Sequence, residues 1–243
     1  MTTPMPINRT IVRLGALSVF GRWRGLLLMV LPVVLLGLAV LIRVLVGEDQ
    51  PVTENTLYAF GLSVVTPLVA LLATSGQLAP EIDDGSISYL LAKPLPRSSI
   101  VVSKLVVAIG CVLVFAAVPL LVAGLVLLAS EPAIAVGFGL AGLLGGVAYC
   151  SLFALLSVLT RHAIVVGLIY LLIWEGLLGG LLDGVRWLSI TRWSGEIVDA
   201  VASTTIVTDV PTWYALVASF VVILGGAWLT GHRLRGFNLT GDE

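Results

Sequence analysis

Long apolar runs constrain this chain more than any other feature. The first, residues 25–46, contains a single charged residue, Arg43. An α-helix needs about 20 apolar residues to cross the hydrocarbon core of a bilayer. The run is too long for the core of a cleaved signal peptide, and no small-residue cleavage site follows it. It therefore predicts a membrane-spanning helix.

The composition extends this prediction to the whole chain. Hydrophobic residues make up 58% and charged residues 11%, against about 45–50% and about 25% in soluble domains. We expect one all-α transmembrane domain over residues 1–243, crossing the membrane six times. The predicted spans are residues 25–46, 57–73, 100–128, 133–159, 163–182 and 212–231. The net charge of −1, with no basic tract, argues against a nucleic-acid partner.

Basic residues predict the orientation. One side of the predicted topology carries Arg9, Arg13, Arg22, Arg24, Lys93, Arg97, Lys104, Arg161, Arg233 and Arg235. The opposite loops are acidic, with Glu48, Asp49, Glu54 and Glu131. Because basic residues concentrate on the cytoplasmic side, both termini are expected there. Residues 7–24 are amphipathic and predict an elbow helix in the membrane interface, the alternative being a disordered basic leader.

The loop over residues 76–99 predicts a short cytoplasmic helix. Ser86 can cap its N-terminus, and Pro94 marks its end. Its apolar face consists of Ile87, Leu90 and Leu91. Such an exposed apolar face suits docking to a partner protein. The alternative is that this face lies on the membrane.

This loop resembles the permeases of type-2 ATP-binding-cassette (ABC) exporters. The resemblance is carried by Glu81, Asp84, Gly85, Ser86, Ile87, Tyr89, Leu90, Leu91, Pro94 and Arg97, with Lys104 opening the next span. Ser86 stands where the family more often has threonine, and it keeps the hydroxyl group. The resemblance also covers the topology, which is an elbow helix followed by six spans.

The resemblance implies a division of labour between chains. Residues 86–92 would be the coupling helix, seated on a separate ATPase subunit that binds ATP and magnesium. Two ATPase copies would join this chain and a second permease, either identical or related, in the inner (plasma) membrane of a prokaryote. Glu81 would lie at the joint between the subunits, although it could equally act as a structural cap. The exported substrate is left open between drugs, peptides, lipids and ions.

The outer part of the chain contains a second candidate region, residues 183–210. Its tryptophans, Trp187 and Trp193, suit the membrane–water interface, and Ser194 is expected to cap a short helix. The resemblance implies an external gate here, the alternative being an interfacial anchor. The predicted pathway residues are Glu175, Arg186, Trp187 and Trp193.

Glu175 lies within the fifth predicted span. A carboxylate within a membrane is costly and is a functional candidate for that reason. It could line the pathway, pair with Arg43 or Arg186, or be protonated.

Small residues recur on two of the predicted spans. Gly139, Gly142 and Gly146 share a face of the fourth, and Gly176, Gly179 and Gly180 cluster on the fifth. Such faces allow helices to approach closely in lipid. We expect tight packing at both sites, with a sliding surface as the alternative.

Enzymatic activity is not expected. The sequence has no phosphate-binding Gly-x-x-x-x-Gly-Lys-Ser/Thr motif. Its two histidines, His162 and His232, fall at predicted helix ends, away from the depth at which intramembrane catalysis would need them. Two other functions remain open. One is an ATP-independent channel or secondary transporter, which would favour inverted repeats and several buried ionisable residues. The other is a membrane anchor or immunity subunit without transport.

Overall fold

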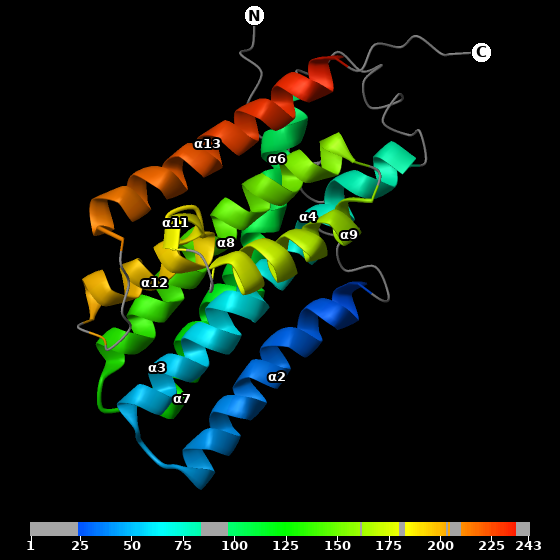
Figure 1. Ribbon diagram of the computed structural model, residues 1–243. Coiled ribbons are helices and arrows are strands. Elements are labelled where there is room, and N and C mark those ends of the chain that lie inside the picture. The colour runs from blue at the N-terminus through cyan, green and yellow to red at the C-terminus, as the bar shows by residue number, and fades with distance from the viewer. Residues whose placement is uncertain are drawn as a thin grey trace, which may run out of the picture.

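The computed structural model describes residues 24–83, 97–160, 162–179, 183–202, 204 and 210–236. These residues form a helical bundle (Figure 1). The helices are α2 (Arg24–Leu45), α3 (Gln50–Thr56), η1 (Leu57–Val65), α4 (Thr66–Asp83), α6 (Arg97–Val112), η2 (Leu113–Ala117), α7 (Val118–Leu127), α8 (Pro132–Leu159), α9 (Ala163–Ile169), η3 (Tyr170–Leu178), α11 (Asp183–Arg186), α12 (Ile190–Val201) and α13 (Thr212–Gly236). The three η elements are π-helical.

The chain is an all-α membrane protein, as predicted. Within the described residues, five helices are long and apolar enough to span a membrane: Gly25–Leu45, Gln50–Ser75, Val102–Leu127, Pro132–Leu159 and Thr212–Arg233. A further apolar helix, Ala163–Leu178, is shorter. The count of six spans therefore stays a prediction. The elbow helix falls on residues that, apart from Arg24, lie outside the described part of the chain.

The second helix is longer than the predicted span at both ends. It starts at Gln50, because the side chain of Asp49 accepts a hydrogen bond from the Val52 amide at 2.9 Å and caps the helix. Glu54 made this stretch look like a loop in the sequence, yet it is only 1% exposed. At the other end the helix continues to Asp83, into the segment expected to be cytoplasmic loop.

Helix α8 lies at the centre of the bundle and packs against α4, α7, α12 and α13. Its glycine face allows this. A Cβ atom added to Gly142 would lie 2.5 Å from Leu120 Cδ1, and one added to Gly139 would lie 3.1 Å from Leu121 Cβ. A Cβ atom added to Gly146 would likewise clash with the side chain of Val112. The tight packing predicted for this face is confirmed.

The glycines of the fifth predicted span behave differently. The atoms nearest to a Cβ on Gly176 or Gly179 belong to their own helix, and Gly180 lies outside the described residues. Gly176 is exposed. For Gly176 and Gly179 the prediction of a tight helix–helix face was therefore wrong.

Prolines explain two of the π-helical segments. Segments η1 and η2 each end two residues before a proline, Pro67 and Pro119. A proline ring clashes with the carbonyl four residues earlier, and a wider turn relieves the clash. The wider turn is visible in the hydrogen bond from the Thr66 amide to the Gly61 carbonyl, five residues back. No proline lies within η3 or its described flanks, so its winding has another origin.

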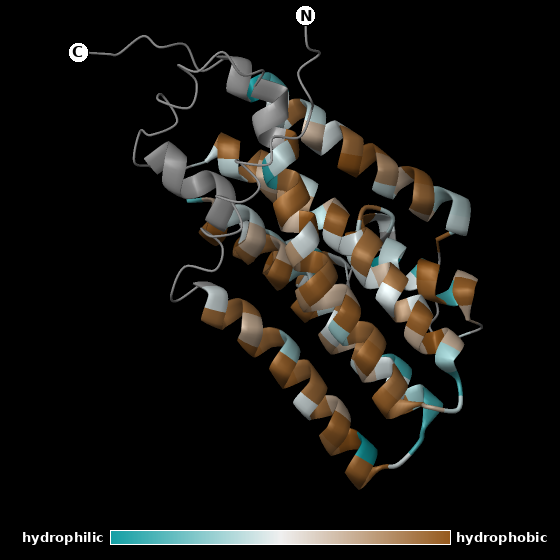
Figure 2. Cartoon of the chain, turned by 180° about the vertical axis from the view of Figure 1, so that it is seen from behind, coloured by the Kyte–Doolittle hydropathy of each residue, from teal (hydrophilic) through white to brown (hydrophobic). Residues whose placement is uncertain are grey.

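Hydrophobic residues predominate along the helices of the bundle (Figure 2), and many of their large side chains are exposed. Helices α2 and α13 lie on opposite flanks (Figure 1), and only 22% of the most apolar stretch of each is buried within the chain. Leu224 on α13 and Val33 on α2 are 67% and 65% exposed. Surfaces of this kind require lipid or another apolar helix as a neighbour.

Candidate functional site

Most of the predicted ATPase contact lies outside the described residues. This applies to Asp84, Gly85, Ser86, Ile87, Tyr89, Leu90, Leu91 and Pro94. Glu81 falls in the last turn of α4, and Arg97 is the first residue of α6. Helices α4 and α6 pack against each other, so the predicted contact is flanked by two neighbouring helices. The contact itself stays a prediction.

Glu175 lies on η3 and points to the start of α12. Its Oε2 atom accepts a hydrogen bond from Ser189 Oγ at 2.5 Å. Its Oε1 atom accepts one from the Ile190 amide at 2.9 Å. Ser189 caps α12, and Ile190 is the first residue of that helix. The carboxylate thus occupies the positive end of a helix dipole, where unpaired amides and negative charge stabilise each other.

The π-helical winding of η3 creates this arrangement. Tyr170 and Glu175 are five residues apart, and in a regular α-helix they would point about 140° apart. In η3 the Tyr170 hydroxyl instead donates a hydrogen bond to Glu175 Oε1 at 3.3 Å. Trp174 stacks on Tyr170, with ring centroids 6.4 Å apart. π-Helical segments are rare and occur often at functional sites, and η3 aims a carboxylate at a neighbouring helix.

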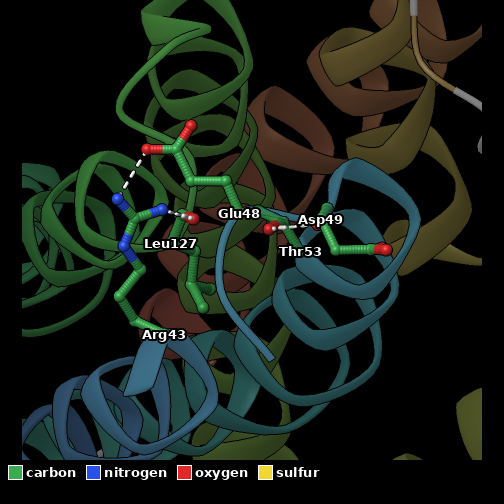
Figure 3. A network of polar contacts seen from close by, with 5 residues as sticks. All are labelled: Arg43, Glu48, Asp49, Thr53 and Leu127. Atoms are coloured by element: carbon green, nitrogen blue, oxygen red, sulfur yellow. Dashed lines mark hydrogen bonds and ion pairs between the residues drawn. The ribbon is translucent and has the colours of Figure 1, made fainter. Parts of the chain in front are cut away.

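Arg43 does not pair with Glu175, contrary to one of the sequence-based alternatives. Its Nη2 atom lies 2.6 Å from Glu48 Oε1, and its Nη1 donates to the Leu127 carbonyl at 3.2 Å (Figure 3). Leu127 is the last residue of α7, so the guanidinium lies at the negative end of that helix. Arg43 therefore connects the C-terminal end of α2 to the C-terminal end of α7. The side chain of Arg186 is not described.

Helix α12 starts five residues earlier than the sequence predicted. Its cap is Ser189, whose Oγ accepts a hydrogen bond from the Arg192 amide at 3.2 Å. The expected cap, Ser194, lies in the second turn and donates to the Ile190 carbonyl. Ser194 faces Gly145 of α8, where a larger residue would clash with it. The prediction was wrong because Ser194 packs against α8 from within the helix, whereas Ser189 has the extended backbone and the side-chain hydrogen bond of a cap.

The two predicted tryptophans meet at one carbonyl group. Trp193 is only 3% exposed, and its Nε1 donates to the Trp187 carbonyl at 2.9 Å. The hydroxyl of Tyr214 donates to the same carbonyl at 3.1 Å. The Trp187 ring packs edge-on against Tyr214 and is 40% exposed. Trp193 is therefore a core residue. Of the two tryptophans, only Trp187 has the exposure expected at the membrane–water interface.

Sequence reasoning missed the polar contacts that hold α12 inside the protein. The hydroxyls of Tyr149 and Thr191 lie 2.8 Å apart, joining α8 to α12. The Thr212 hydroxyl donates to Glu196 Oε1 at 2.6 Å, joining α13 to α12. Both contacts join residues distant in sequence, so no local pattern indicates them. Helix α12 is thus buried among other helices rather than lying on the membrane surface.

Comparison with known families gives one result. The model of a family described as ABC-2 family transporter protein matches residues 22–229. The match runs from just before α2 into α13 and includes Glu175 and α12. No match was found among curated proteins.

Proposed function

The chain belongs to the ABC-2 family of transporter proteins, and from this premise we propose that it exports its substrate with energy from a separate ATPase subunit. The family match itself supports a multi-pass membrane permease of an ABC-type transporter. It covers residues 22–229, and this is the observation that carries the proposal. The sequence contains no phosphate-binding loop, which is consistent with an ATPase on another chain.

The proposed ATPase contact is the segment between α4 and α6. Glu81, Leu90 and Leu91 would meet the partner, with the acidic side chain pairing a basic group and the leucines filling an apolar groove. Two ATPase copies would bind two permeases, either two copies of this chain or one plus a related chain. Closure of the ATPase dimer on ATP would then move α4 and α6, which pack on each other and on α8.

The proposed external gate is built from Glu175 and the segment that follows it. The hydrogen bonds from Ser189 and Ile190 to Glu175 support this, because they join η3 to α12 at the end of the bundle predicted to be external. The substrate would leave where these two elements separate.

Co-purification with the cognate ATPase tests the proposal. We expect the wild-type chain to bind the ATPase and to stimulate ATP turnover in lipid vesicles. Replacing Glu81, Leu90 and Leu91 together by alanine should abolish both effects. The control is Leu224→Ala, at an exposed position of α13, which should leave both intact. Unchanged binding and turnover in the triple variant would show that the contact lies elsewhere.

The same vesicles separate the rival functions. A channel or secondary transporter would move substrate without the ATPase. Equal transport rates with and without ATP would support this alternative. An anchor or immunity subunit would bind its partner without any transport. The present proposal requires transport that depends on both ATP and the ATPase.

A further inference from the structure

Helix α12 and segment η3 meet at Glu175, but the bundle holds them very differently. Eight of the twelve residues of α12 are buried. None of the nine residues of η3 is buried. Leu172 and Leu177 of η3 are 71% and 55% exposed. Segments with few buried contacts open at lower free-energy cost than those in the core.

The contacts of α12 fix it to two long helices. Thr191 is hydrogen-bonded to Tyr149 of α8, and Glu196 accepts a hydrogen bond from Thr212 of α13. Val198 packs directly on Gly137 of α8, where an added Cβ atom would lie 3.2 Å from Val198 Cγ1. Moving α12 would break buried polar contacts on both sides at once, and buried polar groups are costly to leave unpaired.

Hydrogen bonds of η3 with other elements converge on the start of α12, and Glu175 also interacts with Tyr149 of α8. Glu175 binds Ser189 and Ile190, and Trp174 Nε1 donates to the Leu188 carbonyl at 3.4 Å. In Figure 1 the chain from α9 into η3 crosses the front of the bundle and ends beside α11. One cluster of hydrogen bonds therefore closes η3 onto the bundle.

We propose that η3 is the moving side of the external gate and that Glu175 is the latch that closes it onto a stationary α12. This inference rests on the proposed export function and assigns its gating motion to the outer half of the fifth helix. When the latch opens, water entering the gap hydrates the Glu175 carboxylate, the Ser189 hydroxyl and the Ile190 amide. Hydrogen bonds to water thereby replace those lost between η3 and α12. If the two segments separated without water between them, all three groups would be left unpaired.

Distance measurements between spin labels test the latch on the full chain in lipid nanodiscs. The native thiols, Cys111 and Cys150, are buried and are replaced by alanine. One label pair, Leu177→Cys with Val201→Cys, reports η3 against α12. A second pair, Leu140→Cys with Val201→Cys, reports α8 against α12. All three positions are exposed.

Two substitutions should open the latch. Glu175→Leu and Ser189→Ala are expected to add a component several ångströms longer to the 177–201 distance and to leave the 140–201 distance unchanged. The matched controls are Glu175→Gln, which keeps a carbonyl acceptor, and Ser194→Ala, the same change on the same helix away from Glu175. Both should resemble the parent protein. An unchanged 177–201 distance in Glu175→Leu, or a change confined to 140–201, overturns the latch.

A second measurement separates this inference from the proposed function. In the complex with the ATPase, trapping the ATP-bound state should lengthen the 177–201 distance with 140–201 unchanged. If α12 moves against α8 instead, then α12 is the gate and the inference is wrong. If the substitutions open the latch but ATP moves neither pair, the latch contact stands while the ATP-driven gate is refuted.

Discussion

A single methyl group on α13 tests the packing that positions the site. Gly226 faces α8, and a Cβ atom added there would lie 2.9 Å from the Ser151 carbonyl oxygen and 3.0 Å from its carbonyl carbon. These are backbone atoms of a helix, so no side-chain rotation can relieve the clash. The neighbouring Gly225 has nothing within 4 Å of such an atom. The pair Gly226→Ala and Gly225→Ala therefore differs in packing alone.

The expected magnitude follows from these distances. To reach ordinary contact at 3.4 Å, α13 must move away from α8 by about half an ångström. Overpacking of this size typically costs about 1–3 kcal/mol. Replacing glycine in a helix also gains about 1 kcal/mol, but both variants share that gain. We therefore expect Gly226→Ala to be less stable than Gly225→Ala by about 1–3 kcal/mol.

Reversible unfolding by sodium dodecyl sulfate in mixed micelles, followed by tryptophan fluorescence, measures this difference. A local effect on the neighbouring helix α12 is also expected. Because Thr212 at the start of α13 holds Glu196 of α12, Gly226→Ala should perturb the fluorescence of the buried Trp193 more than Gly225→Ala does. Equal stability of the two variants would refute the close approach of α13 to α8.

Three further predictions follow from individual contacts. Arg43→Met should lower the free energy of unfolding by about 1–2 kcal/mol, because it removes a charged hydrogen bond to the Leu127 carbonyl. Arg43→Lys should recover part of this loss. Equal stability of wild type and Arg43→Met would show that this contact between α2 and α7 contributes nothing to stability. Tyr149→Phe and Thr191→Val should each cost about 1–3 kcal/mol by leaving a buried partner unpaired. The double variant should cost less than the sum of the two, whereas strict additivity in a double-mutant cycle would show that the hydroxyls do not interact. A cysteine at Ser88 should react with a membrane-impermeant thiol reagent only from the cytoplasmic side, and labelling from outside would reverse the predicted orientation.

The sequence by itself determined the membrane environment and the helical class. Apolar runs as long as residues 25–46 indicate a bilayer, and in lipid a helix satisfies its own backbone groups. The glycine face of α8 was also readable, because Gly139, Gly142 and Gly146 recur at helical spacing and small residues there have one main use in lipid. Family membership was indicated by the motif around Gly85, although the motif itself lies outside the described residues.

Only the tertiary structure decided what Glu175 does. Its partners, Ser189 and Ile190, follow 14 and 15 residues later, and two things outside the local sequence bring them together. One is the π-helical register of η3, which turns the carboxylate toward α12. The other is the packing of Ser194 against Gly145, which makes Ser189 the cap. Local pattern fixes which residues are apolar or charged, whereas helix register and the choice between similar caps depend on contacts that form only when distant helices pack.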